Sequence, residues 1–363
     1  MQNYRILSKK GEGTFSQVMR AVNIQTQKQV AIKCMKRTLD SMAEVNRLFE
    51  IQALRKLAGH PHIVQLHDVL FEDHRLAIVF ELMDMNLYEA IKDRKMYLPE
   101  SRVVKWMFQL LLAIDHMHKN ELFHRDVKPE NLLILGDVLK LADLGSCCPV
   151  NASQPFTEYI STRWYRAPEC LLTSGYYSGK MDIWAVGCVF YELMTLNPLF
   201  PGKNELDTAD KIHAVLGTPS EEVMTRFRKL SFDHLKDVEF PKVRGCGIAR
   251  SLSHCSAELI GFLQDLLTYD PDRRLSASQS LTHPFFARFL HPPNKRSVSP
   301  ASTSVELLSP RGAKIAPLGK KWPKGMPSFR SRSCHFPLLS ERKAAARKPK
   351  VVPMFPASTR NPK

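Results

Sequence analysis

The sequence predicts an α+β fold of two lobes, a small strand-rich lobe and a larger helical lobe, followed by a disordered basic tail. Short apolar runs typical of strands dominate about the first 80 residues. Helical periodicity of apolar residues replaces them from about residue 100 onward. Beyond residue 286, proline, serine and basic residues dominate. We therefore divide the chain into a folded domain at 4–286, with lobes at about 4–82 and 83–286, and a tail at 287–363.

Strands and one helix are expected in the small lobe. The runs "QVAIK" (Gln29–Lys33) and "LAIVFE" (Leu76–Glu81) have the composition of strands. Between them, residues 41–57 place apolar side chains such as Val45 and Leu54 at three-to-four spacing. This spacing predicts one helix that packs its apolar face on the sheet.

Two buried helices are expected in the large lobe. The stretches Val103–His118 and Asp182–Met194 are apolar nearly all round, which is typical of helices inside a large core. The longest apolar stretch, Ile183–Met194, is too short to cross a bilayer, and the N-terminal residues lack a signal-peptide core. We therefore expect a soluble monomer without a membrane span, with a ligand cleft between its lobes.

The net charge of +16 is concentrated in the tail. Residues 287–363 hold 17 Lys and Arg against 2 Glu, a net charge of +15, which leaves +1 for residues 1–286. Twelve of the 24 prolines also lie there, and such a composition buries too little apolar surface to offset chain entropy. The tail could bind an acidic partner, an import receptor or anionic lipid, or be only a solvated linker. Nucleic-acid binding is less favoured, because no fold presents its aromatic residues for stacking.

A glycine-rich loop and a strand lysine come first among the motifs. In "GEGTFSQV" (Gly11–Val18), Gly11 and Gly13 let backbone N–H groups approach phosphate oxygens, although Ser16 replaces a third glycine and a plain hairpin turn is an equal alternative. Lys33 ends the strand "VAIK", and Glu50 on the following helix is its natural partner, unless the two form an ordinary surface pair.

Further along the chain, "HRDVKPEN" (His124–Asn131) follows a buried helix, "ADLG" (Ala142–Gly145) follows two short strands, and "APE" (Ala167–Glu169) comes next. In this order the motifs resemble those of a eukaryotic protein kinase, and the resemblance covers Tyr4–Phe286. It implies a two-lobed protein kinase fold and an ATP- and Mg²⁺-dependent enzyme. The implied reaction transfers the γ-phosphate to serine or threonine of protein substrates.

The resemblance also implies roles for individual residues. Lys33 would hold the α- and β-phosphates while Glu50 orients it, and Asn131 and Asp143 would offer the oxygen ligands that Mg²⁺ prefers. The segment "FELMDMN" (Phe80–Asn86) resembles the gatekeeper and hinge, where backbone groups of Glu81 and Met83 would meet adenine and Asn86 would reach the ribose. The residues expected to meet the nucleotide are Gly11, Gly13, Val18, Ala31, Lys33, Phe80, Glu81, Met83 and Asn86.

The acceptor side of the reaction falls to the "HRDVKPEN" segment. Asp126 would accept or orient the proton of the substrate hydroxyl, and Lys128 would steady the γ-phosphate. Because the six polar catalytic positions are all intact, an active enzyme is favoured over a pseudokinase that acts as a binding scaffold.

The activation lip narrows the resemblance to one branch. "TEYISTRWYRAPE" (Thr157–Glu169) resembles the mitogen-activated kinases and, with "ELMDMNLYE" (Glu81–Glu89), the MAK-like branch of the CMGC group. Thr157 and Tyr159 would be the activation phosphosites, and Arg274 would pair with Glu169 to hold the base of the lip. The branch implies cytoplasmic, nuclear and ciliary locations and a role in limiting cilium length.

Three positions depart from the kinase pattern. Leu144 stands where the D-F-G motif has phenylalanine, which keeps Asp143 and predicts a shifted in/out equilibrium rather than loss of function. Of three arginines that clamp a lip phosphothreonine, only Arg125 is present, since Phe49 and Cys148 occupy the other positions. A clamp without two arginines should order the lip less.

The arginines expected around a phosphotyrosine, Arg163 and Arg166, are both present. We therefore expect that phosphorylation of Tyr159, made by the enzyme itself, contributes more to activity than phosphorylation of Thr157. Arg166 also lies where the group shapes a pocket for proline after the target residue, so some proline direction is expected.

Overall fold

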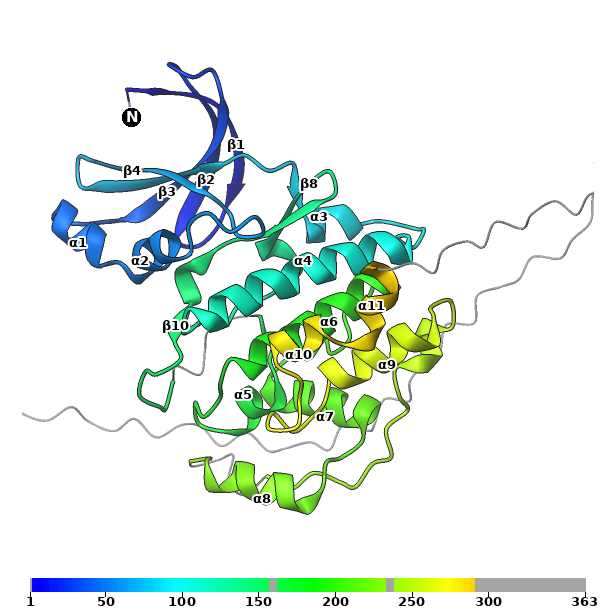
Figure 1. The fold of residues 1–363 in the computed structure, drawn as a ribbon. Helices are drawn as coiled ribbons and strands as arrows, with labels where there is room; N and C mark the ends of the chain where they lie inside the picture. Colours follow the sequence, from blue (N-terminus) through cyan, green and yellow to red (C-terminus); the bar gives the residue numbers. More distant parts are fainter. Residues whose placement is uncertain (1, 157–161, 233–237, 291–363) are drawn as a thin grey trace, which may run out of the picture. The chain divides into compact units, whose positions relative to one another are not determined.

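The computed structural model describes residues 2–156, 162–232 and 238–290 (Figure 1). Its first element is a five-stranded antiparallel sheet in the order β1-β2-β3-β5-β4, drawn in blue. The strands are β1 (Tyr4–Glu12), β2 (Ser16–Asn23), β3 (Gln29–Thr38), β4 (Leu66–Glu72) and β5 (Arg75–Glu81). Both strands predicted from apolar runs are therefore present.

The alternation of β5 explains how the sheet is covered. Ala77 and Val79 point to one face, where they pack with Ile32 in a small apolar cluster. Leu76 and Ile78 point to the other face and join the main core of the protein. The sheet thus shares its second face with the rest of the domain.

The helix expected over residues 41–57 is two helices, so that prediction was wrong. The chain forms α1 (Met42–Arg47) and α2 (Phe49–Lys56), and Leu48 between them has extended backbone angles of φ −62° and ψ 124°. Leu48 donates its N–H to the Val45 carbonyl in a tight turn. Apolar spacing did not reveal the break because buried side chains continue on both sides of it, and Glu50 consequently lies in the first turn of α2.

The second lobe is mainly helical. Its helices are α3 (Leu87–Ile91), α4 (Glu100–Lys119), α5 (Pro168–Leu172), α6 (Lys180–Thr195), α7 (Glu205–Leu216), α8 (Glu221–Lys229), α9 (Ala257–Leu266), α10 (Ala277–Leu281) and α11 (Pro284–Leu290). Short strands and 3₁₀ helices connect them: β6 (Met85–Asn86), β7 (Leu122–Phe123), η1 (Pro129–Asn131), β8 (Leu132–Leu135), β9 (Val138–Leu141), η2 (Leu144–Ser146), β10 (Cys148–Pro149), η3 (Arg163–Tyr165) and η5 (Ala249–Leu252).

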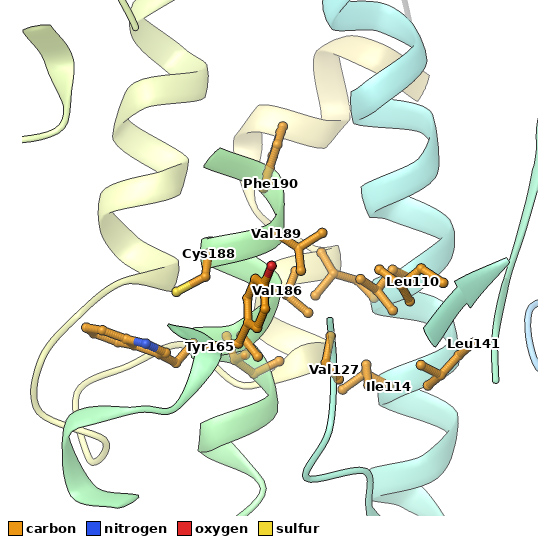
Figure 2. Packing of buried hydrophobic residues seen from close by; sticks show 14 of the residues in the cluster. Leu110, Ile114, Val127, Leu141, Tyr165, Val186, Cys188, Val189 and Phe190 are labelled. Atoms are coloured by element: carbon orange, nitrogen blue, oxygen red, sulfur yellow. The ribbon is translucent and has the colours of Figure 1, made fainter. Parts of the chain in front are cut away.

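Helix α6 forms the centre of this lobe. Every residue from Met181 to Thr195 is buried, and α6 packs against α4 and α9. Figure 2 shows Val186 and Val189 of α6 and Leu110 and Ile114 of α4 in one apolar cluster. Since α6 has no solvent face, it can hold neighbouring loops in fixed positions.

The predicted α+β architecture, a strand-rich lobe followed by a helical one, is confirmed. Within the described part of the chain, no helix is both long enough and apolar enough to span a bilayer. Nearly all of the expected tail lies outside the described residues, as do Thr157 and Tyr159 of the lip.

Candidate active site

A cavity of about 320 Å³ lies between the sheet and the helical lobe. Eight of the nine residues expected to meet a nucleotide line it, and only Gly13 does not. The lining includes four of the six expected catalytic and metal-binding residues, namely Lys33, Glu50, Asn131 and Asp143, but not Asp126 or Lys128. The full set is Lys10, Gly11, Ser16, Val18, Ala31, Lys33, Glu50, Val64, Phe80, Glu81, Leu82, Met83, Met85, Asn86, Glu89, Glu130, Asn131, Leu133, Ala142 and Asp143.

At the inner end of this cavity, Lys33 of β3 binds two carboxylates. Its Nζ lies 2.7 Å from Glu50 Oε1 and 2.9 Å from Asp143 Oδ1. Burial alone would lower the pKa of Lys33, but the charges of Asp143 and Glu50 outweigh it and raise that pKa. Burial opposes ionisation of Asp143 in the same way, and attraction to Lys33 nevertheless lowers its pKa. Lys33 and Asp143 are therefore both charged at neutral pH.

The segment around Leu144 shows how the departure from phenylalanine is accommodated. Asp143 adopts left-handed backbone angles (φ 60°, ψ 73°) and starts η2, in which Leu144 is 1% exposed. The η2 turn packs against α2, the helix that carries Glu50. A Cβ at Gly145 would lie 3.3 Å from Asp143 Oδ1, so glycine keeps the carboxylates close. With leucine the apolar position is filled and the Lys33–Glu50 pair is formed.

Asp126, in the loop before η1, does not line the cavity itself but is bound to Asn131, which does. Its Oδ2 accepts hydrogen bonds from Lys128 Nζ at 2.8 Å and from Asn131 Nδ2 at 3.0 Å. Its Oδ1 is buried and has no hydrogen-bond partner among the described residues. Because a buried carboxylate oxygen without a partner is costly, this atom is suited to receive a hydroxyl proton from a bound molecule.

Asp182, at the start of α6, holds this loop in place. Its carboxylate accepts the backbone N–H of His124 at 2.8 Å and that of Arg125 at 2.9 Å. His118 Nε2 lies 2.9 Å from the same carboxylate. Arg125 has φ 68°, a strained value for a residue other than glycine, so the loop depends on these bonds. Asp182 was not predicted, because an acidic residue at the start of a helix is common and the sequence does not show its partners in another loop.

The arginine expected to clamp a lip phosphate has other partners here. Arg125 Nε donates to the Ser146 carbonyl at 2.6 Å, and one of its terminal nitrogens lies 3.3 Å from the Tyr177 hydroxyl. Phe49 is 36% exposed and Cys148 is half-buried at the other two clamp positions. Neither side chain can donate a charge-assisted hydrogen bond.

The expected Glu169–Arg274 pair is formed in the core. Arg274 NH1 lies 2.7 Å from Glu169 Oε1 and NH2 lies 2.9 Å from Oε2, with both side chains almost fully buried. The guanidinium also stacks over Trp184 of α6 at 5.0 Å from the ring centre. Arg166 is buried as well and binds Glu205 at 2.9 Å, whereas Arg163 is exposed.

The glycine-rich loop is held from β3. Gly13 donates its N–H to the Ser16 carbonyl, which closes the turn between β1 and β2. Lys36 Nζ binds the Gly13 carbonyl at 2.9 Å and Glu12 Oε1 at 2.8 Å. Ser16, the residue in place of the third glycine, begins β2 and lines the cavity.

The hinge has a partner that the sequence analysis also missed. Lys10 of β1 donates to the carbonyls of Met83 and Asp84 at the outer end of the cavity. Glu81, at the end of β5, accepts from the Gln65 N–H through its side chain at 2.7 Å. The contact of Lys10 with the hinge could not be predicted, because the sequence of one strand does not show which distant residues its lysine side chains will contact.

The donor set at the inner end fits a magnesium ion bound with a nucleotide. Asn131 uses its amide nitrogen in bonds to Asp126, so its carbonyl oxygen is the atom left for a cation. Asp143 offers a carboxylate beside it, and Mg²⁺ prefers such oxygen ligands and usually shares them with phosphates. Among the described residues, no cluster of three or more His, Cys, Asp or Glu side chains could hold a metal by itself.

Comparisons with known proteins agree with this geometry. A family model described as protein kinase domain matches residues 4–286. The human MAPK/MAK/MRK overlapping kinase is 50% identical over 288 residues, which are 79% of this chain and 68% of that kinase. The mouse serine/threonine-protein kinase ICK is 42% identical over 287 residues, 79% of this chain and 45% of the relative. The mouse serine/threonine-protein kinase MAK is 40% identical, with 79% and 46% covered.

Proposed function

The chain belongs to the protein kinase family and is a serine/threonine protein kinase related to the MAK-like kinases, and we propose how its own residues share the reaction. ATP occupies the cavity between the lobes, with its base at the hinge and its phosphates at Lys33. Glu50 holds Lys33 in position, and the ammonium offsets phosphate charge. Mg²⁺, bound through Asn131 and Asp143, would neutralise further charge on the phosphates.

The observation that carries this proposal is that Asp126 Oδ1 is buried and has no hydrogen-bond partner in the part of the chain that the structure describes. Its other oxygen is occupied by Lys128 and Asn131, so only Oδ1 can accept the proton of a serine or threonine hydroxyl. As that proton leaves, the hydroxyl oxygen attacks the γ-phosphorus and the bond to the leaving ADP oxygen breaks. Lys128, 2.8 Å from Asp126, is placed to steady the transferred group.

Transfer of ³²P from Mg-ATP to a basic protein substrate tests this function directly. The purified chain is compared with an Asp143→Ala variant, which loses a cation ligand and a partner of Lys33. We expect transfer by the chain and none by the variant. If neither transfers phosphate while both bind nucleotide and remain folded, the chain is a scaffold rather than a catalyst. That outcome would refute the proposal.

For regulation, we propose that the Thr-Glu-Tyr lip is controlled mainly through Tyr159. The support lies in the clamp, where Arg125 already donates to Ser146 and to Tyr177, and where two further arginines are replaced by Phe49 and Cys148. Fewer charge-assisted bonds are therefore offered to a phosphate on Thr157.

Two further proposals concern the substrates and the location of the chain, and they rest on Arg166 and on the resemblance to the MAK-like branch. Some preference for proline after the target residue is proposed because Arg166 is held rigidly by Glu205 beside the lip. A signalling role in control of cilium length, with cytoplasmic and nuclear pools, follows the MAK-like relationship. Paired peptides that differ only in that proline, and imaging of the tagged chain in ciliated cells, test the two proposals separately.

A further inference from the structure

Lys10 occupies an irregular position in β1. In the pairing of β1 with β2, Lys9 faces Met19 and Gly11 faces Val18, so two steps on β1 correspond to one step on β2. Lys10 is the extra residue of this β-bulge. A bulge turns a side chain away from the regular alternation of its strand, and bulges are common beside active sites. Here the bulge directs Lys10 across the outer end of the cavity.

The Lys10 ammonium binds main-chain atoms of the hinge. Its Nζ lies 2.8 Å from the carbonyl oxygen of Met83 and 2.5 Å from that of Asp84. Both contacts are to backbone oxygens, and the structure shows no ion pair between Lys10 and the Asp84 carboxylate. Hydrogen bonds from a charged donor are stronger than those from a neutral donor. The two bonds of Lys10 therefore connect β1 firmly to the hinge.

The hinge groups that a base would meet follow one another along the chain. The proposed function places the base at the hinge, where the kinase resemblance implies contacts with backbone groups of Glu81 and Met83. In that arrangement the adenine amine at C6 would donate to one carbonyl and the ring nitrogen N1 would accept one N–H. The third position along this edge is C2, which carries only hydrogen in adenine. In that arrangement C2 would face the Met83 carbonyl, to which Lys10 donates.

We propose that Lys10 is a specificity-determining residue. Its ammonium donates to the Met83 carbonyl, and the cavity therefore favours bases that donate to only one hinge carbonyl. This inference rests on the proposed nucleotide site. Adenine leaves the Met83 carbonyl unused, so it binds without displacing Lys10. A base with a further amine at C2 would bring a second donor to the same oxygen, beside a positive ammonium whose hydrogens repel it.

The neighbouring lysine shows that this arrangement is specific to Lys10. Lys9 pairs with Glu12 on the same strand and does not line the cavity. Lys28, in the turn between β2 and β3, is exposed and lies far along the chain from the hinge. Substitution of Lys28 therefore changes the net charge of the same sheet without changing the cavity.

The test measures whether Lys10 changes the effect of a 2-amino group on nucleotide affinity. Dissociation constants of Mg-ADP and of its 2-amino derivative, the 2,6-diaminopurine nucleotide, are determined for the full chain, for Lys10→Met and for Lys28→Met. Methionine keeps an unbranched apolar stem over the base and removes only the ammonium. In Lys10→Met the freed carbonyl accepts the new amine, and one added neutral hydrogen bond should favour the 2-amino nucleotide about threefold to tenfold. The full chain and Lys28→Met should show no such preference.

Two outcomes would overturn the inference, and they are distinguishable. If ADP binds but the preference between the two nucleotides is the same in all three proteins, Lys10 does not control the Met83 carbonyl. If the full chain binds no ADP, the proposed nucleotide site fails, and this inference fails with it. Lys10→Gln, which keeps a neutral donor, serves as the second variant if Lys10→Met unfolds. Its preference should lie between those of lysine and methionine.

Discussion

The substitution Asp182→Asn should both destabilise the domain and slow the reaction. The carboxylate accepts three hydrogen bonds, from His118 and from the backbone N–H groups of His124 and Arg125. Asparagine keeps one acceptor oxygen but places an NH₂ group where the other oxygen was. At least one of the two backbone N–H groups then faces a donor in the buried interior.

The magnitude follows from these contacts. A hydrogen bond to a charged group contributes about 1.5 to 3 kcal/mol, and a buried N–H without a partner costs about 1 to 3 kcal/mol. The free energy of unfolding should therefore fall by about 3 to 5 kcal/mol, a large part of the roughly 5 to 15 kcal/mol typical of a domain. Relaxation of the strained Arg125 backbone would also move Asp126 from its position, and kcat should fall by about tenfold to a hundredfold.

Denaturant unfolding and steady-state phosphate transfer measure the two effects. The matched control is Asp137→Asn, because Asp137 is about half exposed and its pairs with Arg102 and Lys105 lie at the surface. That change should cost less than about 1 kcal/mol. If Asp182→Asn and the control behave alike in stability and in kcat, the bonds to α6 do not position the loop, and the reasoning is refuted.

Three further tests examine other parts of the chain. Glu169→Gln leaves the buried guanidinium of Arg274 without its charge partner and should lower the free energy of unfolding by about 3 to 5 kcal/mol. The surface variant Asp137→Asn again serves as the control. Burial raises the pKa of Glu192 from 4.5 to about 7, although the hydrogen bond from Tyr165 opposes this shift. The contribution of Glu192 to the free energy of unfolding is therefore fully present below pH 4.5 and is lost as the pH rises through 7. Glu192→Gln should remove that slope in urea titrations, and an unchanged slope would assign it to other groups. Tyr159→Phe should reduce activity more than Thr157→Ala, and a larger loss from the threonine change would contradict the proposed control of the lip.

The residues of the inner cavity were predictable because their chemistry demands particular side chains. Lys33, Glu50 and Asp143 are far apart in sequence, and only the order of motifs indicated that they would meet. The strands and buried helices were also predictable, since periods of two and of 3.6 residues leave different patterns. For these elements, local pattern and tertiary packing favour the same structure.

Other features could not be predicted because nothing local specifies them. The break at Leu48 preserves the apolar spacing on both sides, so periodicity cannot detect it. The contact of Lys10 with the hinge depends on a bulge in the pairing of two strands, which a single strand does not encode. Asp182 resembled an ordinary acidic residue at a helix start until its partners in another loop were known.

Helix α6 also fixes the distance between two segments that it holds. Near its first turn, Asp182 holds the loop of Asp126, and ten residues later Glu192 accepts the hydroxyl of Tyr165 at 2.7 Å. At 1.5 Å per residue these two attachment points are roughly 15 Å apart along the axis. An insertion of one residue between them would lengthen that spacing and rotate one attachment by about 100°. The length of α6 therefore fixes the position of the Asp126 loop relative to the segment that contains Tyr165. A different substrate-binding segment grafted onto this chain should work only if the length of α6 is left unchanged.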